Sequence, residues 1–314
     1  MKQKPKVIVI CGPTASGKTG LSIQLAKQID GEIISSDSMQ IYQDMNIGTA
    51  KPSVEERQGI PHYLLDFLPP NKRYSVADFK KDAMLAIETI LSHGRVPIIV
   101  GGTGLYVDSL IYNIEYPEIT VDLSYRNQLE ESAKKEGLAS LYKQAEKIDL
   151  QAMQSISPND KKRIMRVLEI YHQTGKTKTQ LEELSRKTLP PFDYHVFAIN
   201  MDRQILYDRI NLRVDKMIEQ GLIEEVKNIL QKYDKFPTAM QGLGYKEVVS
   251  YLQGKMTKEE ILEKLKMETR RYAKRQLTWF RKNKEIIWLN GLDPIQKNIQ
   301  CILEEYSGKT KGEK

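Results

Sequence analysis

The chain has 314 residues, of which 40% are hydrophobic and 28% charged, which excludes a disordered or fibrous protein and leaves room for two globular domains. Its two cysteines, Cys11 and Cys301, lie far apart in the sequence and do not indicate a disulfide framework. No stretch has the length of a signal peptide or a membrane span. We therefore expect a cytoplasmic protein with no membrane association. The formal net charge of +7 favours an anionic partner, which could be a nucleic acid, a membrane surface or phosphorylated metabolites.

A glycine-rich segment follows the first predicted strand, Val7 to Cys11, and precedes a helical pattern, Leu21 to Ile29. It fits the phosphate-binding pattern G-x-x-x-x-G-K-[ST] and reads Gly12-Pro13-Thr14-Ala15-Ser16-Gly17-Lys18-Thr19. Such a loop turns backbone N–H groups and a helix N-terminus toward an anion, while Lys18 adds a full charge and Thr19 offers a hydroxyl to Mg²⁺. The motif predicts a bound phosphorylated ligand but does not say which reaction that ligand serves.

The first third of the chain alternates apolar runs with helical patterns, as a doubly wound parallel sheet in an α/β protein requires. A helix is expected between a capping box that begins at Ser75 and a stop at Gly94. A Gly-Gly-Thr-Gly segment at 101–104 predicts a second loop that approaches a ligand closely. The strands that we expect here are Val7 to Cys11, Glu32 to Ser35, Val96 to Val100 and, more weakly, His62 to Leu65.

Strand signals stop after about residue 116, where two helices are expected, Leu123 to Lys147 and Ser157 to Thr174. The second helix should have Ser157 as its N-cap and Gly175 as its terminator. We therefore expect a first core part at 1–116, a helical insertion at 117–190, a second core part at 191–306 and a disordered tail at 307–314. Four cations near the start of the second helix suit either solvent or a phosphate backbone, namely Lys161, Lys162, Arg163 and Arg166.

The α/β pattern resumes with a strand, His195 to Asn200, and a helix capped by Asp202 that runs to about Gly221. Spacings of four and three place three cations on one stripe of that helix, namely Arg209, Arg213 and Lys216. A last long helix begins at a capping box at Thr257, and a strand-like segment, Glu285 to Leu289, follows it.

The end of that long helix is strongly basic: between Glu268 and Lys284 there are seven basic residues and one acidic residue, with aromatic residues among them. This pattern is typical of a nucleic-acid surface. It is equally typical of a solvated helix face whose core stripe is Tyr272, Leu277 and Phe280.

Asp37 follows the strand Glu32 to Ser35 at the edge where a doubly wound sheet binds its ligands. From its position alone it is equally suited to be a general base, a Mg²⁺ ligand or the cap of the next short segment.

Six segments, together with Gln276 to Phe280, resemble the tRNA dimethylallyltransferase family, also called tRNA isopentenyltransferases, over nearly the whole chain. They occur in the family's order and are Gly12 to Thr19, Ser36 to Tyr42, Gly48 to Pro52, Gly101 to Tyr106, Asn159 to Arg163 and Arg213 to Met217. The resemblance implies a P-loop NTPase-like fold and a monomer that transfers a dimethylallyl group from dimethylallyl diphosphate to the exocyclic amine of the adenosine 3′ of the anticodon. It implies that Gly12 to Thr19 holds the diphosphate.

The resemblance also assigns roles to single residues. The catalytic set is Asp37, which takes the proton of the adenine amine, with Lys18, Thr19 and Arg213 at the leaving group, while Thr19 and Ser16 hold the Mg²⁺ cofactor. The tRNA contacts that it implies are Asp37, Ser38, Met39, Gln40, Thr103, Arg126, Lys161, Lys162, Arg163, Gln241, Gly242, Arg270, Arg271, Lys274 and Arg275.

Three other functions fit the phosphate loop. A small-molecule or nucleotide kinase needs a second Mg²⁺-supporting acid after an apolar strand, but Val96 to Val100 ends in Gly-Gly, and Asp66 is only a partial substitute. An enzyme that prenylates free adenine nucleotides does not need the basic insertion. A non-enzymatic RNA-binding GTPase or ATPase does not require Asp37 beside a diphosphate.

Overall fold

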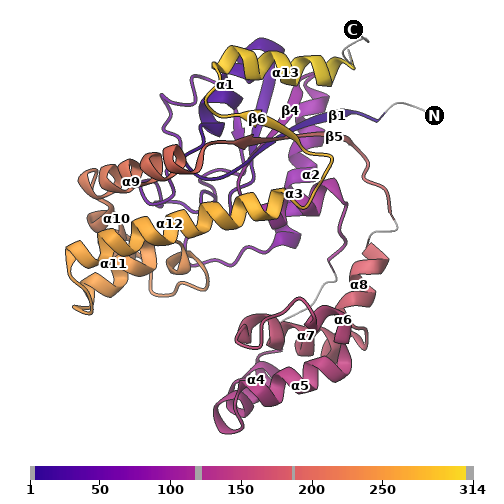
Figure 1. Ribbon diagram of the computed structural model, residues 1–314, viewed down its shortest axis with the longest axis vertical. Coiled ribbons are helices and arrows are strands. Elements are labelled where there is room, and N and C mark those ends of the chain that lie inside the picture. The colour runs from indigo at the N-terminus through magenta and orange to yellow at the C-terminus, as the bar shows by residue number, and fades with distance from the viewer. Residues whose placement is uncertain (1–3, 117–121, 186–187, 309–314) are drawn as a thin grey trace. The chain divides into compact units, whose positions relative to one another are not determined.

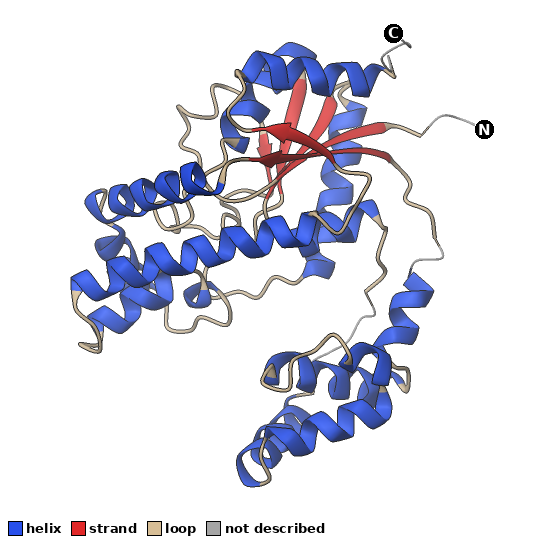
Figure 2. Cartoon of the chain, viewed as in Figure 1, coloured by secondary structure: helices blue, strands red, loops and turns tan. Residues whose placement is uncertain are grey.

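The computed structural model describes residues 4–116, 122–185 and 188–308 and divides the chain into two units (Figure 1). One unit comprises residues 1–111 and 191–314, and the other comprises residues 112–190. All described strands belong to the first unit, whereas the described elements of the second are helices (Figure 2). The division lies at residues 112 and 190, close to the limits of 117 and 190 expected for the insertion.

The first unit contains a six-stranded parallel sheet in the order β3-β2-β4-β1-β5-β6. The sheet is therefore of the doubly wound type that the sequence predicts, and the carboxyl ends of β1, β2 and β4 lie beside one another at the edge where such sheets bind ligands. The strands are β1 (Lys6–Cys11), β2 (Gly31–Ser35), β3 (His62–Tyr63), β4 (Val96–Gly101), β5 (Asp193–Asn200) and β6 (Ile287–Asn290).

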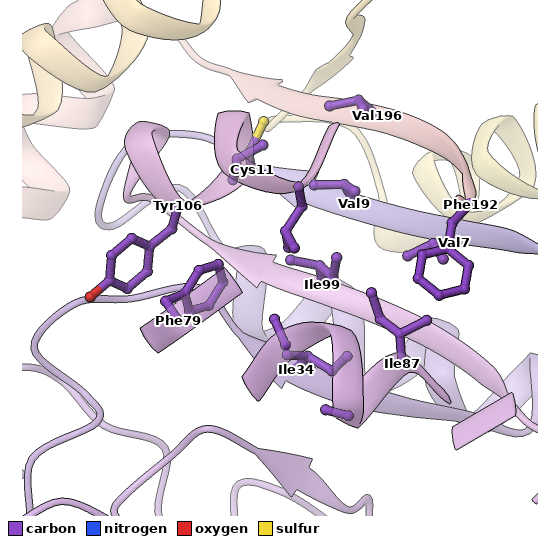
Figure 3. Packing of buried hydrophobic residues seen from close by; sticks show 14 of the residues in the cluster. Val7, Val9, Cys11, Ile34, Phe79, Ile87, Ile99, Tyr106, Phe192 and Val196 are labelled. Carbon is purple, nitrogen blue, oxygen red and sulfur yellow. The ribbon is translucent and has the colours of Figure 1, made fainter. Parts of the chain in front are cut away.

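Helices cover both faces of the sheet, which explains why its central strands are apolar throughout and not alternating. Helices α1 (Lys18–Ile29) and α13 (Ile295–Ser307) pack on one face. On the other lie α2 (Val76–Ser92), α3 (Gly104–Ile111) and the end of α12 (Lys258–Phe280). Figure 3 shows this second core, in which the rings of Phe79 and Tyr106 stack at 4.0 Å between centroids.

Three predicted helix starts are confirmed by side-chain hydrogen bonds. Ser75 and Asp78 form a capping box at α2, and Thr257 and Glu260 form one at α12. Asp202 accepts hydrogen bonds from two backbone N–H groups at the start of α9 (Arg203–Glu219). These caps define where the long helices begin and therefore which side chains reach the sheet edge.

A group of helices that the sequence did not predict extends the first unit beyond the sheet. It consists of α10 (Leu222–Lys232), the short η1 (Ala239–Gln241) and α11 (Tyr245–Leu252), which share a hydrophobic core with α9 and α12. Helices α3 and α13 were also not predicted. Within the described residues, no helix combines the length and the apolar character needed to cross a membrane.

Two sequence predictions for the second unit are wrong. The single helix expected from Leu123 to Lys147 is two helices, because Gly137 adopts a left-handed backbone angle of φ 84° between them. Ser157 is not the N-cap of the next helix: Asp160 takes that position, with its carboxylate accepting the N–H of Arg163 at 3.1 Å. The helices are α4 (Leu123–Lys135), α5 (Leu138–Ile148), α6 (Leu150–Met153), α7 (Lys161–Thr174) and α8 (Lys178–Ser185). The predicted tail lies outside the described residues from 309 onward.

Candidate active site

The phosphate loop lies between the carboxyl end of β1 and the N-terminus of α1. Gly12 and Gly17 have φ angles of 137° and 92°, which side chains rarely adopt, and a Cβ on Gly12 would lie 3.1 Å from the backbone of Ile199. Gly17 is the N-cap of α1, and no side chain caps that end. The first N–H groups of α1 are therefore available to an anion.

Lys18 is held against the loop by its own backbone, since its Nζ donates to the carbonyls of Gly12 at 3.0 Å and Pro13 at 2.7 Å. Burial, with a smaller contribution from the positive charge of Arg213, lowers the pKa of Lys18 from 10.5 to about 8. An anion in the loop would remove this electrostatic penalty on the charged form. The environment of Lys18 therefore favours binding of a negatively charged group.

Arg213 of α9 also contacts the phosphate loop. Its Nη1 donates to the hydroxyl of Thr14 at 3.2 Å, although the two residues are 199 positions apart in the sequence. Burial lowers the pKa of this guanidinium too. Arg209 and Lys216, the other members of the predicted stripe, are exposed. Only Arg213 of the three lines the cavity beside Lys18, which gives that cavity two cations at its phosphate end.

Asp37 lies just beyond the end of β2, where one carboxylate oxygen accepts the N–H groups of Met39 at 2.8 Å and Gln40 at 3.2 Å. This oxygen caps the turn that follows, one of the three roles considered from the sequence. Among the described residues, no hydrogen bond reaches its other oxygen, and Asp37 lines the cavity. The carboxylate is thus oriented by the backbone while one oxygen remains available to a ligand.

The wall beside Asp37 is formed by Ser38, Thr103 and Tyr272. The Ser38 N–H donates to Thr103 Oγ1 at 3.1 Å, and the Tyr272 hydroxyl also hydrogen-bonds with Thr103. Burial and, to a lesser degree, the negative charge of Asp37 raise the pKa of Tyr272, so it remains a neutral phenol. In one of the two interpretations that the sequence left open, Tyr272 belonged to a core stripe; in the structure it lines the cavity.

Gln40 is oriented by the segment from residue 46 to 50. Its Nε2 donates to the carbonyls of Thr49 at 3.1 Å and Ala50 at 3.2 Å. Glu225 of α10 holds this segment, because its carboxylate accepts the N–H groups of residues 46, 47 and 48 at 2.7 to 3.1 Å and the Tyr245 hydroxyl at 2.7 Å. No motif in the sequence pointed to Glu225.

Most of these groups line one cavity of about 530 Å³, whereas the predicted site residues Gly12, Pro13 and Thr103 are not among its lining residues. The described chain brings together in it most of the core residues that the sequence singled out. The lining includes Thr14 to Thr19, Asp37, Ser38, Met39, Gln40, Arg213, Gln241, Tyr272, Arg275 and Gln276. Gly242 adjoins this wall, since a Cβ there would lie 2.5 Å from Met39 Cε. The phosphate-loop motif, the two cations Lys18 and Arg213, and the carboxylate of Asp37 thus share one space.

Comparison with known proteins identifies the family of this chain. The family model for IPP transferase matches residues 40–283, and the model for isopentenyl transferase matches residues 5–70. The curated tRNA dimethylallyltransferase of Acetivibrio thermocellus is 51% identical over 306 residues, which is 96% of this chain and 98% of that protein. The chain belongs to the IPP transferase family.

Solved structures show the same fold for this IPP transferase. The tRNA isopentenylpyrophosphate transferase of Staphylococcus epidermidis matches with a TM-score of 0.72 and 40% identity over 98% of this chain and 100% of that one. A eukaryotic dimethylallyltransferase studied while acting on tRNA matches with a TM-score of 0.79 and 32% identity over 98% of this chain and 81% of that one. The predicted P-loop NTPase-like α/β fold is confirmed.

The basic residues at the end of α12 fall into two sets in this IPP transferase. Arg270 donates to Asn211 Oδ1 at 2.6 Å, and Arg271 pairs with Glu268 at the same distance, so both are engaged within the chain. Lys274 is exposed, and its ammonium group has no partner among the described residues. Arg275 lies 5.8 Å from the centroid of the Tyr272 ring and lines the cavity.

The basic residues of the insertion also have acidic neighbours. Lys161 pairs with Glu130, and Arg163 lies 3.2 Å from Asp160. Lys162 is exposed. Arg126 makes two hydrogen bonds, of 2.6 and 3.0 Å, to buried Glu169, and these connect α4 to α7. In this structure Arg126 therefore stabilises the insertion itself.

Proposed function

We propose that this IPP transferase moves a dimethylallyl group from dimethylallyl diphosphate to the exocyclic N6 amine of the adenosine 3′ of the anticodon in tRNA, giving N6-(dimethylallyl)adenosine and diphosphate. The observation that carries this proposal is the single cavity in which the phosphate loop, Lys18 and Arg213 face the same space as Asp37. Its relatives, which are tRNA dimethylallyltransferases, support the same assignment.

The leaving group defines the first demand on the site. As the bond from the allylic carbon to oxygen breaks, negative charge grows on the diphosphate and positive charge on the delocalised allyl group. Lys18, Arg213 and the N–H groups of the loop lie where they would stabilise that diphosphate. Because they are already positioned by hydrogen bonds within the protein, little reorganisation is needed during the reaction.

The acceptor defines the second demand. The adenine amine is a weak nucleophile, since its lone pair is delocalised into the ring. As the new nitrogen–carbon bond forms, the amine must lose a proton, and the available oxygen of Asp37 would accept it. The base has to leave its stack to reach the cavity, which costs less in a single-stranded anticodon loop than in a duplex.

We propose Mg²⁺ as the cofactor, held by the hydroxyl groups of Ser16 and Thr19. Two features support it: Ser16 Oγ is buried with no hydrogen-bond partner among the described residues, and Thr19 follows Lys18 at the start of α1 and lines the same cavity. Hard oxygen ligands suit Mg²⁺. When bound there, the ion would neutralise part of the charge of the diphosphate.

We also propose a monomer as the working form and the cytoplasm as its location. One chain supplies the cavity lining from the phosphate loop to Arg275, so the proposed chemistry needs no residue from a second copy. The proposed macromolecular substrate, the anticodon stem-loop of tRNA, is a cytoplasmic molecule.

Mass spectrometry of nucleosides tests the proposed function directly. Undermodified tRNA is incubated with the protein, Mg²⁺ and dimethylallyl diphosphate, and a parallel reaction replaces tRNA with AMP. We expect a mass increase on the adenosine 3′ of the anticodon and none on AMP. Unchanged adenosine in tRNA would refute the proposal, and prenylated AMP would favour an enzyme of free nucleotides.

Salt dependence of tRNA binding distinguishes phosphate contacts from solvated charges. Each true contact releases counterions, so removing one should shallow the slope of log affinity against log salt by about 0.7 to 0.9. We expect this change for Lys274→Ala and Arg275→Ala, whose side chains have no acidic partner in the described parts of the chain, and smaller changes for the paired Lys161, Arg163 and Arg271. The measurement is fluorescence anisotropy with an anticodon stem-loop across salt concentrations.

Asp37→Asn is the control for that titration and should leave the slope unchanged, because the proposed role of Asp37 is proton transfer. A slope unaffected by Lys274→Ala, Arg275→Ala and the charge variants of Lys162 and Arg270 would show that these residues are solvated charges only.

The activity of the enzyme should fall at high pH because Lys18 loses its proton. Its pKa in the free protein is about 8, so its positive charge is present below that pH and lost above it. We expect kcat/KM for dimethylallyl diphosphate to fall as pH rises through about 8. The pKa of Lys18 is lower in the folded protein than in the unfolded chain, so the contribution of Lys18 to the free energy of unfolding increases as pH rises from about 8 toward 10.5. Unfolding caused by Lys18 therefore does not explain the expected fall in kcat/KM. Lys18→Arg, which keeps its charge, should not show this fall; an identical fall in that variant would contradict the assignment.

A further inference from the structure

Gln276 of α12 bridges two loops of the active site with one carboxamide. Its Oε1 accepts the backbone N–H of Thr14 at 2.9 Å, and its Nε2 donates to the carbonyl of Gly102 at 2.8 Å. The side chain is buried. The phosphate loop after β1 and the loop after β4 are therefore joined through a residue more than 170 positions away from both.

The bridge requires an amide of this length. One loop offers a donor and the other an acceptor, and the carboxamide of Gln276 carries both complementary groups in one plane. The fit is close, because a Cβ on Gly102 would lie 2.1 Å from Gln276 Nε2. An apolar side chain would leave the part-buried N–H of Thr14 and the buried carbonyl of Gly102 without these partners, which is costly.

The hydrogen bond to Gln276 also reduces the number of backbone N–H groups that the phosphate loop can offer to an anion. The Thr14 N–H is occupied by Gln276 and is not free to bind an anion. The Thr14 hydroxyl instead accepts from Arg213 at 3.2 Å. A chain of hydrogen bonds thus runs from α12 through Thr14 to the cation that α9 brings to the cavity.

We propose that Gln276 is a positioning residue that sets Thr14, and through it Arg213, at the diphosphate end of the cavity. This inference rests on the proposed function, because it takes an allylic diphosphate as the ligand at that end. The same helix supplies Tyr272 and Arg275 to the cavity lining. Helix α12 therefore fixes the position of the diphosphate site relative to the part of the cavity where the adenine would bind.

The test is Gln276→Met, which keeps length and apolar contacts but removes both polar atoms. We expect kcat/KM for dimethylallyl diphosphate and the affinity for inorganic diphosphate with Mg²⁺ to fall about tenfold or more, while the KM for tRNA changes less than about threefold. Asn298→Ala is the matched control, since it also removes a buried amide, hydrogen-bonded to the Asn290 carbonyl on β6, but away from the cavity. It should lower the melting temperature and leave both diphosphate readouts unchanged.

A double-mutant cycle separates positioning from a loss of stability. If Gln276 acts through the Thr14 hydroxyl, Thr14→Val and Gln276→Met should each lower diphosphate affinity, and the double variant should lose much less than the product of the two effects. Independent effects, or wild-type affinity in folded Gln276→Met, would overturn the inference. Should Gln276→Met not fold, Gln276→Asn, too short to span both loops, takes its place in the same cycle.

The two proposals fail in different ways. If diphosphate affinity falls in Gln276→Met as expected but the wild-type protein transfers no group to tRNA, the proposed function is refuted and this inference is supported. Wild-type protein that modifies tRNA, together with a Gln276→Met variant of equal kcat/KM and diphosphate affinity, would refute this inference alone.

Discussion

Replacing Asp37 with asparagine should lower the turnover number about 10²- to 10⁴-fold while leaving tRNA affinity nearly unchanged. Asparagine retains an oxygen that can accept the N–H groups of Met39 and Gln40, so the turn after β2 should keep its shape. What it lacks is a group that takes a proton at neutral pH. The expected loss therefore lies in the chemical step.

Single-turnover kinetics with prebound dimethylallyl diphosphate and excess enzyme measure that step. Asp78→Asn provides the matched control, because Asp78 is also a carboxylate that accepts a helix-capping hydrogen bond, but at the start of α2. It should retain wild-type turnover. Wild-type single-turnover rates in Asp37→Asn would remove Asp37 from the mechanism and leave it as a cap.

Removing either cation at the phosphate end should lower kcat/KM for dimethylallyl diphosphate by about 10²- to 10³-fold, the usual effect of deleting a group that stabilises charge developing in the transition state. The variants are Lys18→Ala and Arg213→Ala. For Arg213 the loss should appear in kcat as well as in KM, since the diphosphate carries more negative charge after the bond breaks than before.

Arg203→Ala is the comparison variant on the same helix, because Arg203 lies at the start of α9 with its guanidinium over the Tyr207 ring. It should change kcat/KM less than about threefold. Steady-state assays with varied dimethylallyl diphosphate and saturating tRNA measure all three variants. If Arg213→Ala behaved like Arg203→Ala, the stripe on α9 would be a solvated face.

The features that the sequence predicted well depend on near neighbours in the chain. The phosphate loop is set by glycines and the helix that follows within a few residues, and the caps at Ser75, Asp202 and Thr257 are each completed within three residues. The apolar runs of β1, β2 and β4 likewise follow from burial on both faces of a sheet. These could be predicted because the partners of each group are close in sequence.

The errors arose where two local signals competed. Gly137 lies inside an otherwise helical pattern, and its left-handed angle, φ 84°, ends one helix and begins another. Ser157 and Asp160 are both good N-caps three residues apart, and the apolar face of α7, which begins at buried Ile164, favours the later one. The backbone freedom of glycine decided the first case, and packing decided the second.

The sequence by itself determined the phosphate loop, the sheet class and the position of Asp37 at the sheet edge, because each follows from residues within one strand–loop–helix unit. Only the tertiary structure decided that Arg213, and not Arg209 or Lys216, enters the cavity, that Glu225 holds the segment beside Gln40, and that Gln276 joins two loops. Those contacts span more than 170 residues, and hydrogen bonds between such distant groups form only when helices from separate parts of the chain pack against one sheet edge.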